Sequence, residues 1–185
     1  LKARRLASNA YHNLKLSDTI LFKRRNAEAM ALATTLKDSF AMGDVHWNYA
    51  TFYVNKEIYD SAYHHFNDAF SYFDKRGHLF ESAKTQYGMA FIKGRFKDYS
   101  GSEVLTIKAI EKFKKIEDFH SLFSCYNHLG NLQNDINEFD KALFYFDKAI
   151  DNLNKVKNNN SLKEAVLNNI GNTYLKKGDY GNALR

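Results

Sequence analysis

Small side chains recur along this chain at a fixed interval, and that interval limits the possible folds more than any other feature. In one register the small residues are Ala10, Ala50, Ala90, Gly130 and Gly171, at steps of 40, 40, 40 and 41. In a second register the alanines recur at steps of 40, at Ala29, Ala69, Ala109 and Ala149. Periods between about 20 and 50 residues are typical of repeat proteins. We therefore predict one structural unit repeated along nearly the whole chain.

Each unit is predicted to be a pair of helices. The 185 residues include no proline, which would break helix interiors. Within Tyr126–Ala149, Ala142, Phe146 and Ala149 follow one another at spacings of four and three, as on one face of a helix. Two helices cross closely where one of them presents a small side chain, and larger side chains then fill the grooves. An aromatic residue also recurs after the expected turn, at Tyr59, Tyr99, Phe139 and Tyr180.

The segment Tyr126–Ala149 resembles a tetratricopeptide repeat (TPR). The family's aromatic, Leu-Gly and Ala…Phe…Ala positions fall on Tyr126, Leu129, Gly130, Ala142, Phe146 and Ala149. The resemblance implies an all-α, right-handed α-α superhelix, a TPR solenoid of about four and a half helical hairpins. We expect a single array over residues 1–185, with repeats at about 2–40, 43–77, 80–117, 120–157 and an incomplete one at 161–185. Because the 40-residue period exceeds the usual length of about 34, the helices should be longer than in a standard repeat.

The first and third repeats are expected to depart from the pattern. In the first, one helix should cover Lys2–Leu14, and the next should start at Ser17 or Asp18 and run to about Asp38. In the third, Gly88 and Gly94 lie inside a predicted helix, where each costs about 1 kcal/mol relative to alanine. That helix should be poorly ordered, bent or closely approached by a ligand, unless the repeat is simply weak.

The last two repeats should be separated by a polar loop. Asn158, Asn159 and Asn160 form this loop, and Ser161 is the expected N-cap of the helix that follows.

Composition argues against several classes of protein. No apolar run approaches the roughly 20 residues of a membrane-spanning helix. The single cysteine, Cys125, excludes an internal disulfide framework and is interpreted as a small core residue. The net charge is +6, but acidic residues are interleaved with the basic ones, so we expect a solvated surface and no nucleic-acid partner.

Catalytic and metal-binding motifs are absent from the sequence. None of the seven histidines forms HExxH, no GxxxxGK[ST] loop occurs, and Cys125 has no metal-ligating companion at suitable spacing. His64 and His65 should point to different faces of a helix. We therefore expect no enzymatic activity, no cofactor and no metal site.

The resemblance to TPR arrays implies a concave groove, lined by the first helix of each hairpin, that binds extended peptides or helices. The positions that would line it are Trp47, Asn48, Thr51, Lys84, Tyr87, Phe91, Arg95, Asn127, Asn131, Asn134, Asn168 and Asn172. A primary amide both donates and accepts hydrogen bonds, so a row of asparagines can hold a peptide backbone. The alternative is that these amides bond to one another, to water or to the next helix, and that the aromatic residues belong to the core.

Two bacterial groups look similar to this sequence. LNNIGNTYLKKGDYGNAL and YSGSEVLTIKAI resemble the TPR sensor region of Bacteroidetes-type histidine kinases and related regulators. Gram-positive peptide-pheromone receptors have similar repeats. The resemblance implies a protein- or peptide-binding sensory module, with a free-standing scaffold or adaptor as the rival.

The chain begins at Leu1, and we expect it to be a fragment of a longer protein that continues past Arg185. The partners expected are a protein or peptide ligand and a second copy bound through the open C-terminal end, near Leu167, Ile170 and Tyr174. Contact with a membrane would come only through a segment outside these residues. The periplasmic side of a membrane-anchored sensor is the favoured location, and the cytoplasm is the alternative.

Overall fold

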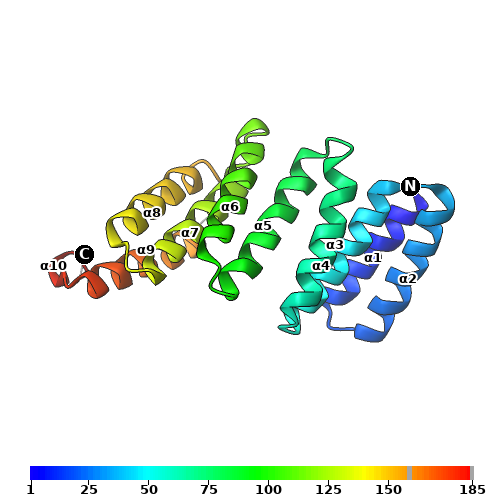
Figure 1. Ribbon diagram of the computed structural model, residues 1–185, viewed down its shortest axis with the longest axis horizontal. Helices are drawn as coiled ribbons and strands as arrows, with labels where there is room; N and C mark the ends of the chain where they lie inside the picture. Colours follow the sequence, from blue (N-terminus) through cyan, green and yellow to red (C-terminus); the bar gives the residue numbers. More distant parts are fainter. Residues whose placement is uncertain (158–159, 184–185) are drawn as a thin grey trace. The chain divides into compact units, whose positions relative to one another are not determined.

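The computed structural model describes residues 1–157 and 160–183, and all regular structure in these ranges is helical. The helices are labelled in Figure 1. Their bounds are α1 (Lys2–Lys15), α2 (Thr19–Leu36), α3 (Ser39–Asn55), α4 (Tyr59–Asp74), α5 (Leu79–Arg95), α6 (Tyr99–Lys115), α7 (Phe119–Asp135), α8 (Phe139–Leu153), α9 (Asn160–Lys177) and α10 (Tyr180–Ala183). The prediction of an all-α fold built from helical hairpins is confirmed.

The junctions between helices repeat at half the interval seen in the sequence. Seven of them have one residue in the left-handed backbone region: Ser17, Lys37, Glu57, Gly77, Lys97, Glu117 and Asn137, at steps of 20 and with φ between 53° and 69°. Such a residue ends a helix because it turns the chain away while the last carbonyls still accept hydrogen bonds. Turns within a hairpin and turns between hairpins are therefore alike.

An aspartate follows several of these residues and starts the next helix. Asp18, Asp38, Asp98 and Asp118 each accept a hydrogen bond from the backbone N–H three residues later, at 2.9–3.2 Å. This bond satisfies one of the free N–H groups of the first turn. Of the two residues predicted to start the second helix, Asp18 is the N-cap, and Ser17 is the left-handed residue before it.

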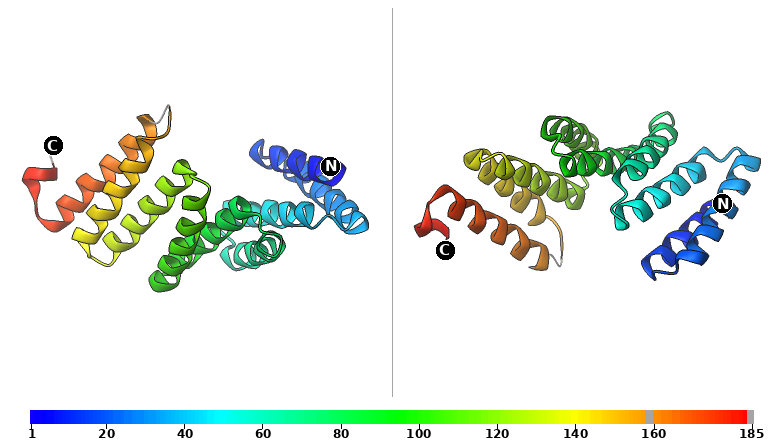
Figure 2. Two further views of the ribbon diagram at one scale, coloured as in Figure 1. Left: turned by 90° about the horizontal axis from the view of Figure 1, so that it is seen from above. Right: turned by 60° about the horizontal axis from the view of Figure 1, so that its bottom comes forward.

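The chain divides into two compact units, Leu1–Ile92 and Lys93–Arg185. Within each, the two helices of a hairpin lie side by side and run in opposite directions (Figures 1 and 2). In the first unit α1 packs on α2 and α3, and α3 packs on α4. In the second unit α7 packs on α6 and α8, and α8 packs on α9.

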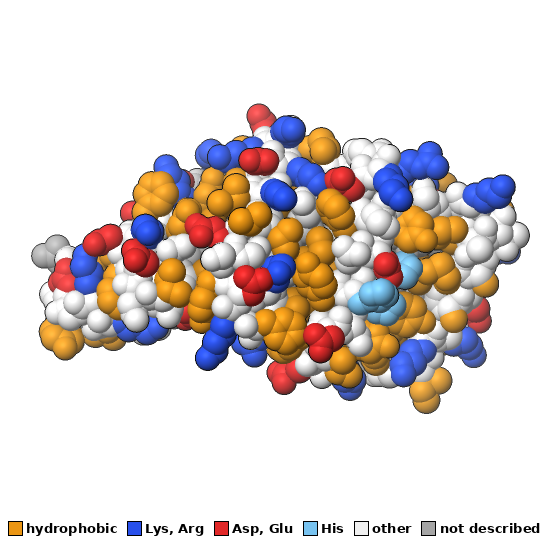
Figure 3. Space-filling model, viewed as in Figure 1, with side chains coloured by type: hydrophobic (Ala, Val, Ile, Leu, Met, Phe, Trp, Pro, Cys, Tyr) orange, Lys and Arg blue, Asp and Glu red, His pale blue; other side chains and the backbone are white. Residues whose placement is uncertain are grey.

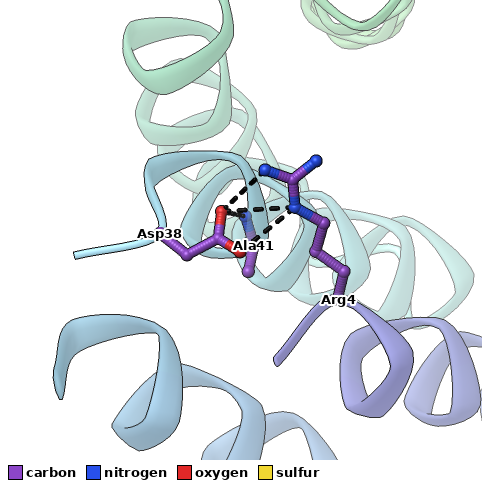
Figure 4. A network of polar contacts seen from close by, with 3 residues as sticks. All are labelled: Arg4, Asp38 and Ala41. Atoms are coloured by element: carbon purple, nitrogen blue, oxygen red, sulfur yellow. Dashed lines mark hydrogen bonds and ion pairs between the residues drawn. The ribbon is translucent and has the colours of Figure 1, made fainter. Parts of the chain in front are cut away.

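A charged contact ties α1 to the start of α3 in the first unit (Figure 4). The Arg4 guanidinium donates two hydrogen bonds of 3.1 Å to the Asp38 carboxylate, which also accepts from the backbone N–H of Ala41. The bond from Arg4 lowers the pKa of Asp38 below its usual value. The guanidinium also lies over the Phe40 ring, 4.4 Å from its centroid.

The recurring small residues lie where helices cross. Ala10, Ala50 and Ala90 are fully buried, as are the alanines of the second register. A Cβ placed on Gly130 would overlap the Phe146 ring, and one placed on Gly88 would come within 2.7 Å of the Phe66 ring. α5 continues from Leu79 to Arg95 through both of its glycines, so the structure gives no support for an interruption there. Gly88 instead accommodates Phe66.

Several predicted boundaries need correction. α2 ends at Leu36, and Asp38 belongs to the next helix as its N-cap. α3 starts at Ser39, before the expected start of the second repeat at residue 43. α9 already includes Asn160, so Ser161 lies within its first turn and is not its N-cap. Asn158 and Asn159 lie outside the described residues.

A bilayer-spanning segment would require a longer and more apolar helix than any that the structure describes.

Candidate functional site

Trp47 on α3 and Lys84 on α5 form the centre of a surface pocket in the first unit. The pocket has a volume of about 210 Å³ and is lined by Ala7, Ser8, Tyr11, Asp44, Trp47, Asn48 and Lys84. Asp44 and Trp47 are three residues apart on α3, so they share one face of that helix. The Lys84 ammonium lies 3.7 Å from the centroid of the Trp47 ring, a cation–π contact.

The pKa values of two ionisable groups in this pocket, Asp44 and Lys84, are shifted from their usual values. Burial raises the pKa of the Asp44 carboxyl to about 7, and the nearby Glu81 adds to this effect. Burial also lowers the pKa of the Lys84 ammonium, although Asp44 and Glu81 oppose that shift. Near neutral pH Asp44 is therefore present in both its protonated and its ionised form, and the Lys84 ammonium is poorly solvated.

The Trp47 indole carries a hydrogen-bond donor with no acceptor. Its Nε1 is buried and has no partner among the described residues, while the ring packs on Phe66 with the centroids 5.1 Å apart. Buried donors in proteins are nearly always paired, with protein, water or a ligand. A ligand carbonyl or carboxylate oxygen in the pocket would accept from the Lys84 ammonium, whereas Nε1 of Trp47 is itself buried.

Asn48 has a different environment from its neighbour Trp47. Its side chain is 3% exposed, and its Nδ2 donates to the carbonyl of Ala7 and to Oδ1 of Asn26, each at 2.9 Å. The Asn26 amide donates in turn to the carbonyl of Val45. These bonds join α1, α2 and α3, so Asn48 holds the first unit together. Thr51 is half-buried and donates to the carbonyl of Trp47 at 3.0 Å.

The other predicted groove residues of α5 lie further along that helix. Tyr87 is half-buried, Phe91 is 37% exposed and Arg95 is exposed. Tyr87 belongs to the first unit and Arg95 to the second. The pocket itself brings together Trp47, Asn48 and Lys84 from the predicted set.

The asparagines of the second unit are partly used between helices. Asn127 on α7 accepts a 3.0 Å hydrogen bond from Nδ2 of Asn169 on α9. Asn168 and Asn172 are exposed. Asn131 is half-buried, and Asn134 is buried with its Oδ1 unpaired among the described residues. The alternative that these amides bond to the next helix therefore applies to Asn127.

The sequence did not indicate Asp44 or Tyr11 as pocket residues. The available signal was the i, i+3 spacing of Asp44 and Trp47, which places a carboxylate beside the only tryptophan. Tyr11 comes from α1, and its approach to α5 depends on how α1 packs against α3.

Cys125 is fully buried, and burial raises the pKa of its thiol, so the thiolate that reacts with electrophiles is disfavoured. This agrees with its interpretation as a core residue.

Comparison with known proteins identifies the class of repeat. The tetratricopeptide repeat family profile matches residues 123–152 and 164–185. Over these two stretches the sequence matches the tetratricopeptide repeat. No curated protein matches the chain.

Solved structures show the same all-α TPR-type fold. BtubC (BKLC) from P. vanneervenii has 20% sequence identity and a TM-score of 0.83, over 98% of this chain and 81% of that one. The apo form of RapI has 15% identity and a TM-score of 0.86, over 100% of this chain and 67% of that one. YrrB, described as a TPR protein with an unusual peptide-binding site, has 17% identity and a TM-score of 0.62, over 97% of this chain and 79% of that one.

Proposed function

We propose that this chain is a non-catalytic module that binds a protein or peptide, with the Trp47–Lys84 pocket as one of its contact points. The observation that carries the proposal is the poorly solvated Lys84 ammonium, which lies over the Trp47 ring in one pocket. Peptide carbonyls and carboxylates are acceptors that match this ammonium. The fold supports the proposal, since YrrB shares it and has a peptide-binding site.

The ligand that fits this pocket is a short extended peptide. Trp47 gives apolar area, and the Lys84 ammonium provides a donor for an acceptor beside it. Asp44 disfavours an anion when it is ionised, so a neutral backbone carbonyl suits the pocket better than a carboxylate at alkaline pH. The exposed amides of Asn168 and Asn172 offer further backbone contacts in the second unit.

The wider setting that we propose is the sensory or interaction region of a bacterial signal-transduction protein, such as a histidine kinase or a transcriptional regulator. Its support is the resemblance of the repeat sequences to those sensor regions. Ligand binding would then bias an attached output domain by stabilising one conformation of the repeats.

Intrinsic fluorescence provides a direct test because Trp47 is the only tryptophan. Random peptides would be selected for binding to the whole chain, and the selected sequences titrated while the emission of Trp47 is followed. We expect micromolar binding that changes this emission, and a loss of about tenfold in affinity for Lys84→Gln. That loss corresponds to one charge-assisted hydrogen bond.

Lys23→Gln is the matched control, because Lys23 lies over the Phe52 ring and does not line this pocket. It should bind the selected peptides as the unchanged chain does. The proposal is wrong if the two lysine variants bind equally well, or if selection yields no peptide whose binding changes the Trp47 emission. A second variant, Asn168→Ala with Asn172→Ala, tests the amide contacts while the fold is checked by circular dichroism.

The rival function is a scaffold that associates with a second copy of itself. α9 favours this reading because Leu167 is 48% exposed and Leu175 is 49% exposed. Ile170 is half-buried against the core of the second unit, and Tyr174 is half-buried, so they are less available than predicted. Light scattering should show a dimer that Leu167→Ser with Leu175→Ser makes monomeric; a monomer at all concentrations would remove this alternative.

A further inference from the structure

We propose that His46, His65 and Asp68 form a binding site for a divalent transition-metal ion such as Zn²⁺. Figure 3 shows histidine side chains gathered beside an acidic side chain on one face of the molecule. His46 comes from α3, and His65 and Asp68 come from α4, so the site would join the two helices of one hairpin. His65 and Asp68 are three residues apart and therefore lie on the same face of α4.

Two of the distances between the ligand atoms match those that a tetrahedral metal ion requires. Nδ1 of His46 lies 3.1 Å from Nδ1 of His65 and 3.4 Å from Oδ2 of Asp68. All three ligand atoms lie within 4.8 Å of one another. Ligands bonded to tetrahedral zinc at about 2.0–2.1 Å are about 3.3 Å apart. A metal ion would therefore fit between these atoms with little movement of the side chains.

Aromatic neighbours hold both imidazole rings in place. The His65 ring is stacked against Tyr53, at 5.4 Å and 7° between planes, and against Tyr49, at 5.2 Å and 27°. The His46 ring is stacked on Tyr72, at 5.8 Å and 25°. Because the rings are already ordered, binding an ion would cost little conformational entropy.

The two imidazoles already meet through nitrogen atoms that can bind a metal. Their Nδ1 atoms lie 3.1 Å apart. Without an ion, one Nδ1–H would donate to the other Nδ1. A metal ion would replace that single hydrogen bond with two coordinate bonds and would also balance the Asp68 carboxylate.

The ligand set and its access favour Zn²⁺ and neighbouring ions over Mg²⁺ or Ca²⁺. Two imidazole nitrogens with one carboxylate suit zinc, copper and nickel, whereas magnesium and calcium prefer oxygen ligands only. The side chains of His46 and Asp68 are 17% and 32% exposed, so an ion can enter from solvent. Three protein ligands leave a position for water.

One further histidine lies at the edge of the cluster. Nε2 of His64 is 3.4 Å from Oδ2 of Asp68, but its side chain is 74% exposed. We assign it to solvent and not to the metal.

A bound ion would act as a clamp between α3 and α4. The His46–His65 pair spans the hairpin, so coordination would oppose the separation of these helices and stabilise the first unit. This role is independent of the peptide pocket, because none of the three ligands lines it.

The test is calorimetric titration of ZnCl₂ into the whole, metal-free chain, together with thermal unfolding in Zn²⁺ and in Mg²⁺. We expect one Zn²⁺ per chain at micromolar affinity or tighter, and a rise in Tm with Zn²⁺ but not with Mg²⁺. His46→Gln and Asp68→Asn should each weaken binding at least tenfold.

His12→Gln is the matched control because His12 is exposed on α1, outside the cluster, and this variant should bind normally. His64→Gln should change the affinity less than threefold. Circular dichroism without metal identifies any variant that has lost its fold, and Asp68→Asn serves as the mildest change. The proposal is overturned if the chain binds no Zn²⁺ at 1 mM, or if His46→Gln and Asp68→Asn bind as tightly as the control. A tenfold loss in His64→Gln would overturn the assignment of three ligands.

Discussion

At the scale of single residues, equivalent positions of the repeats differ in how closely they are packed, although their sequence pattern is uniform. Gly130 and Gly171 occupy the same position in consecutive repeats. A Cβ on Gly130 would overlap the Phe146 ring, whereas the nearest atom to a Cβ on Gly171 is the carbonyl oxygen of Ala183, at 3.7 Å. One glycine is required by packing, and the other leaves room for a side chain.

These two glycines give a matched pair of substitutions. Gly171→Ala should stabilise the fold by up to about 1 kcal/mol, because alanine favours helix. Gly130→Ala should destabilise it by about 1–2 kcal/mol, since overpacking outweighs that gain. Urea denaturation of both variants measures the difference. Equal effects at the two positions would mean that Phe146 moves aside without cost.

Asp44 should make the stability of the chain depend on pH. Its pKa is raised to about 7, so between about pH 4 and pH 7 the folded chain holds a proton that the unfolded chain has released. The ionised Asp44 carboxylate destabilises the folded chain, and this destabilisation becomes smaller as the pH falls from 8 to 5.

Asp44→Asn isolates that contribution, since other groups titrate over the same range. The variant should be more stable than the unchanged chain at pH 8, and this advantage should fall by about 1–2 kcal/mol on going to pH 5. The figure is below that of the full pKa shift because the carboxyl is partly solvated. Chemical denaturation at the two pH values provides the measurement, and a constant difference would contradict a raised pKa.

At the scale of helices, the unit of construction is about 20 residues and not 40. From α1 to α7, a left-handed residue follows the end of each helix and the next helix begins almost at once, whereas the C-cap of α8 is right-handed. The aspartate caps make this abrupt start possible, because they bind N–H groups that no preceding turn can satisfy. The N-caps of α4 and α8, Ile58 and Glu138, make no such side-chain bond, so not every junction depends on a cap.

Asp118 is the clearest position at which to test a cap. Its carboxylate accepts from the backbone N–H of Ser121 at 3.1 Å and from the Ser121 hydroxyl at 2.9 Å. Asp118→Ala should cost about 1 kcal/mol, whereas Asp118→Asn, which keeps an acceptor, should cost much less. Thermal unfolding of the two variants distinguishes the hydrogen bond from the charge: an equal loss in both would assign the effect to the charge.

At the scale of the whole molecule, the principal contacts join neighbouring helices. α7 packs on α6 and α8, and α1 packs on α2 and α3. Repeat proteins with contacts of this kind behave as a series of coupled repeats, and destabilising one repeat affects only its neighbours. Stability should therefore vary along the chain.

Phe146→Ala tests this locality. Phe146 is fully buried in the core of the second unit, so its removal should cost about 3–5 kcal/mol there. Hydrogen exchange should then speed up in α7 and α8, while α1 and α2 keep the protection that they have in the unchanged chain. Equal loss of protection in all helices would show that the chain unfolds as one cooperative body.

The sequence alone determined the class of fold, the positions of most helices and the buried small residues. These follow from local rules, since the missing proline, the fixed interval and the residues at helix ends act over short distances along the chain. The 20-residue repeat of the junctions was also present in the sequence, at Asp18, Asp38, Asp98 and Asp118. The aspartates mark this repeat only in part, because the N-caps of α4 and α8 are Ile58 and Glu138.

Only the tertiary structure decided how the polar side chains are used. Asn48, which was predicted to line a groove, lines the pocket and also donates to the backbone of α1, and Asn127 accepts from Asn169. His46 and His65 are 19 residues apart and match no metal motif, yet their nitrogens lie 3.1 Å apart. The physical reason is that the period of a helix fixes which face a residue lies on, whereas the partner that it meets depends on how two helices are rotated against each other. That rotation is set by the packing of large side chains against small ones.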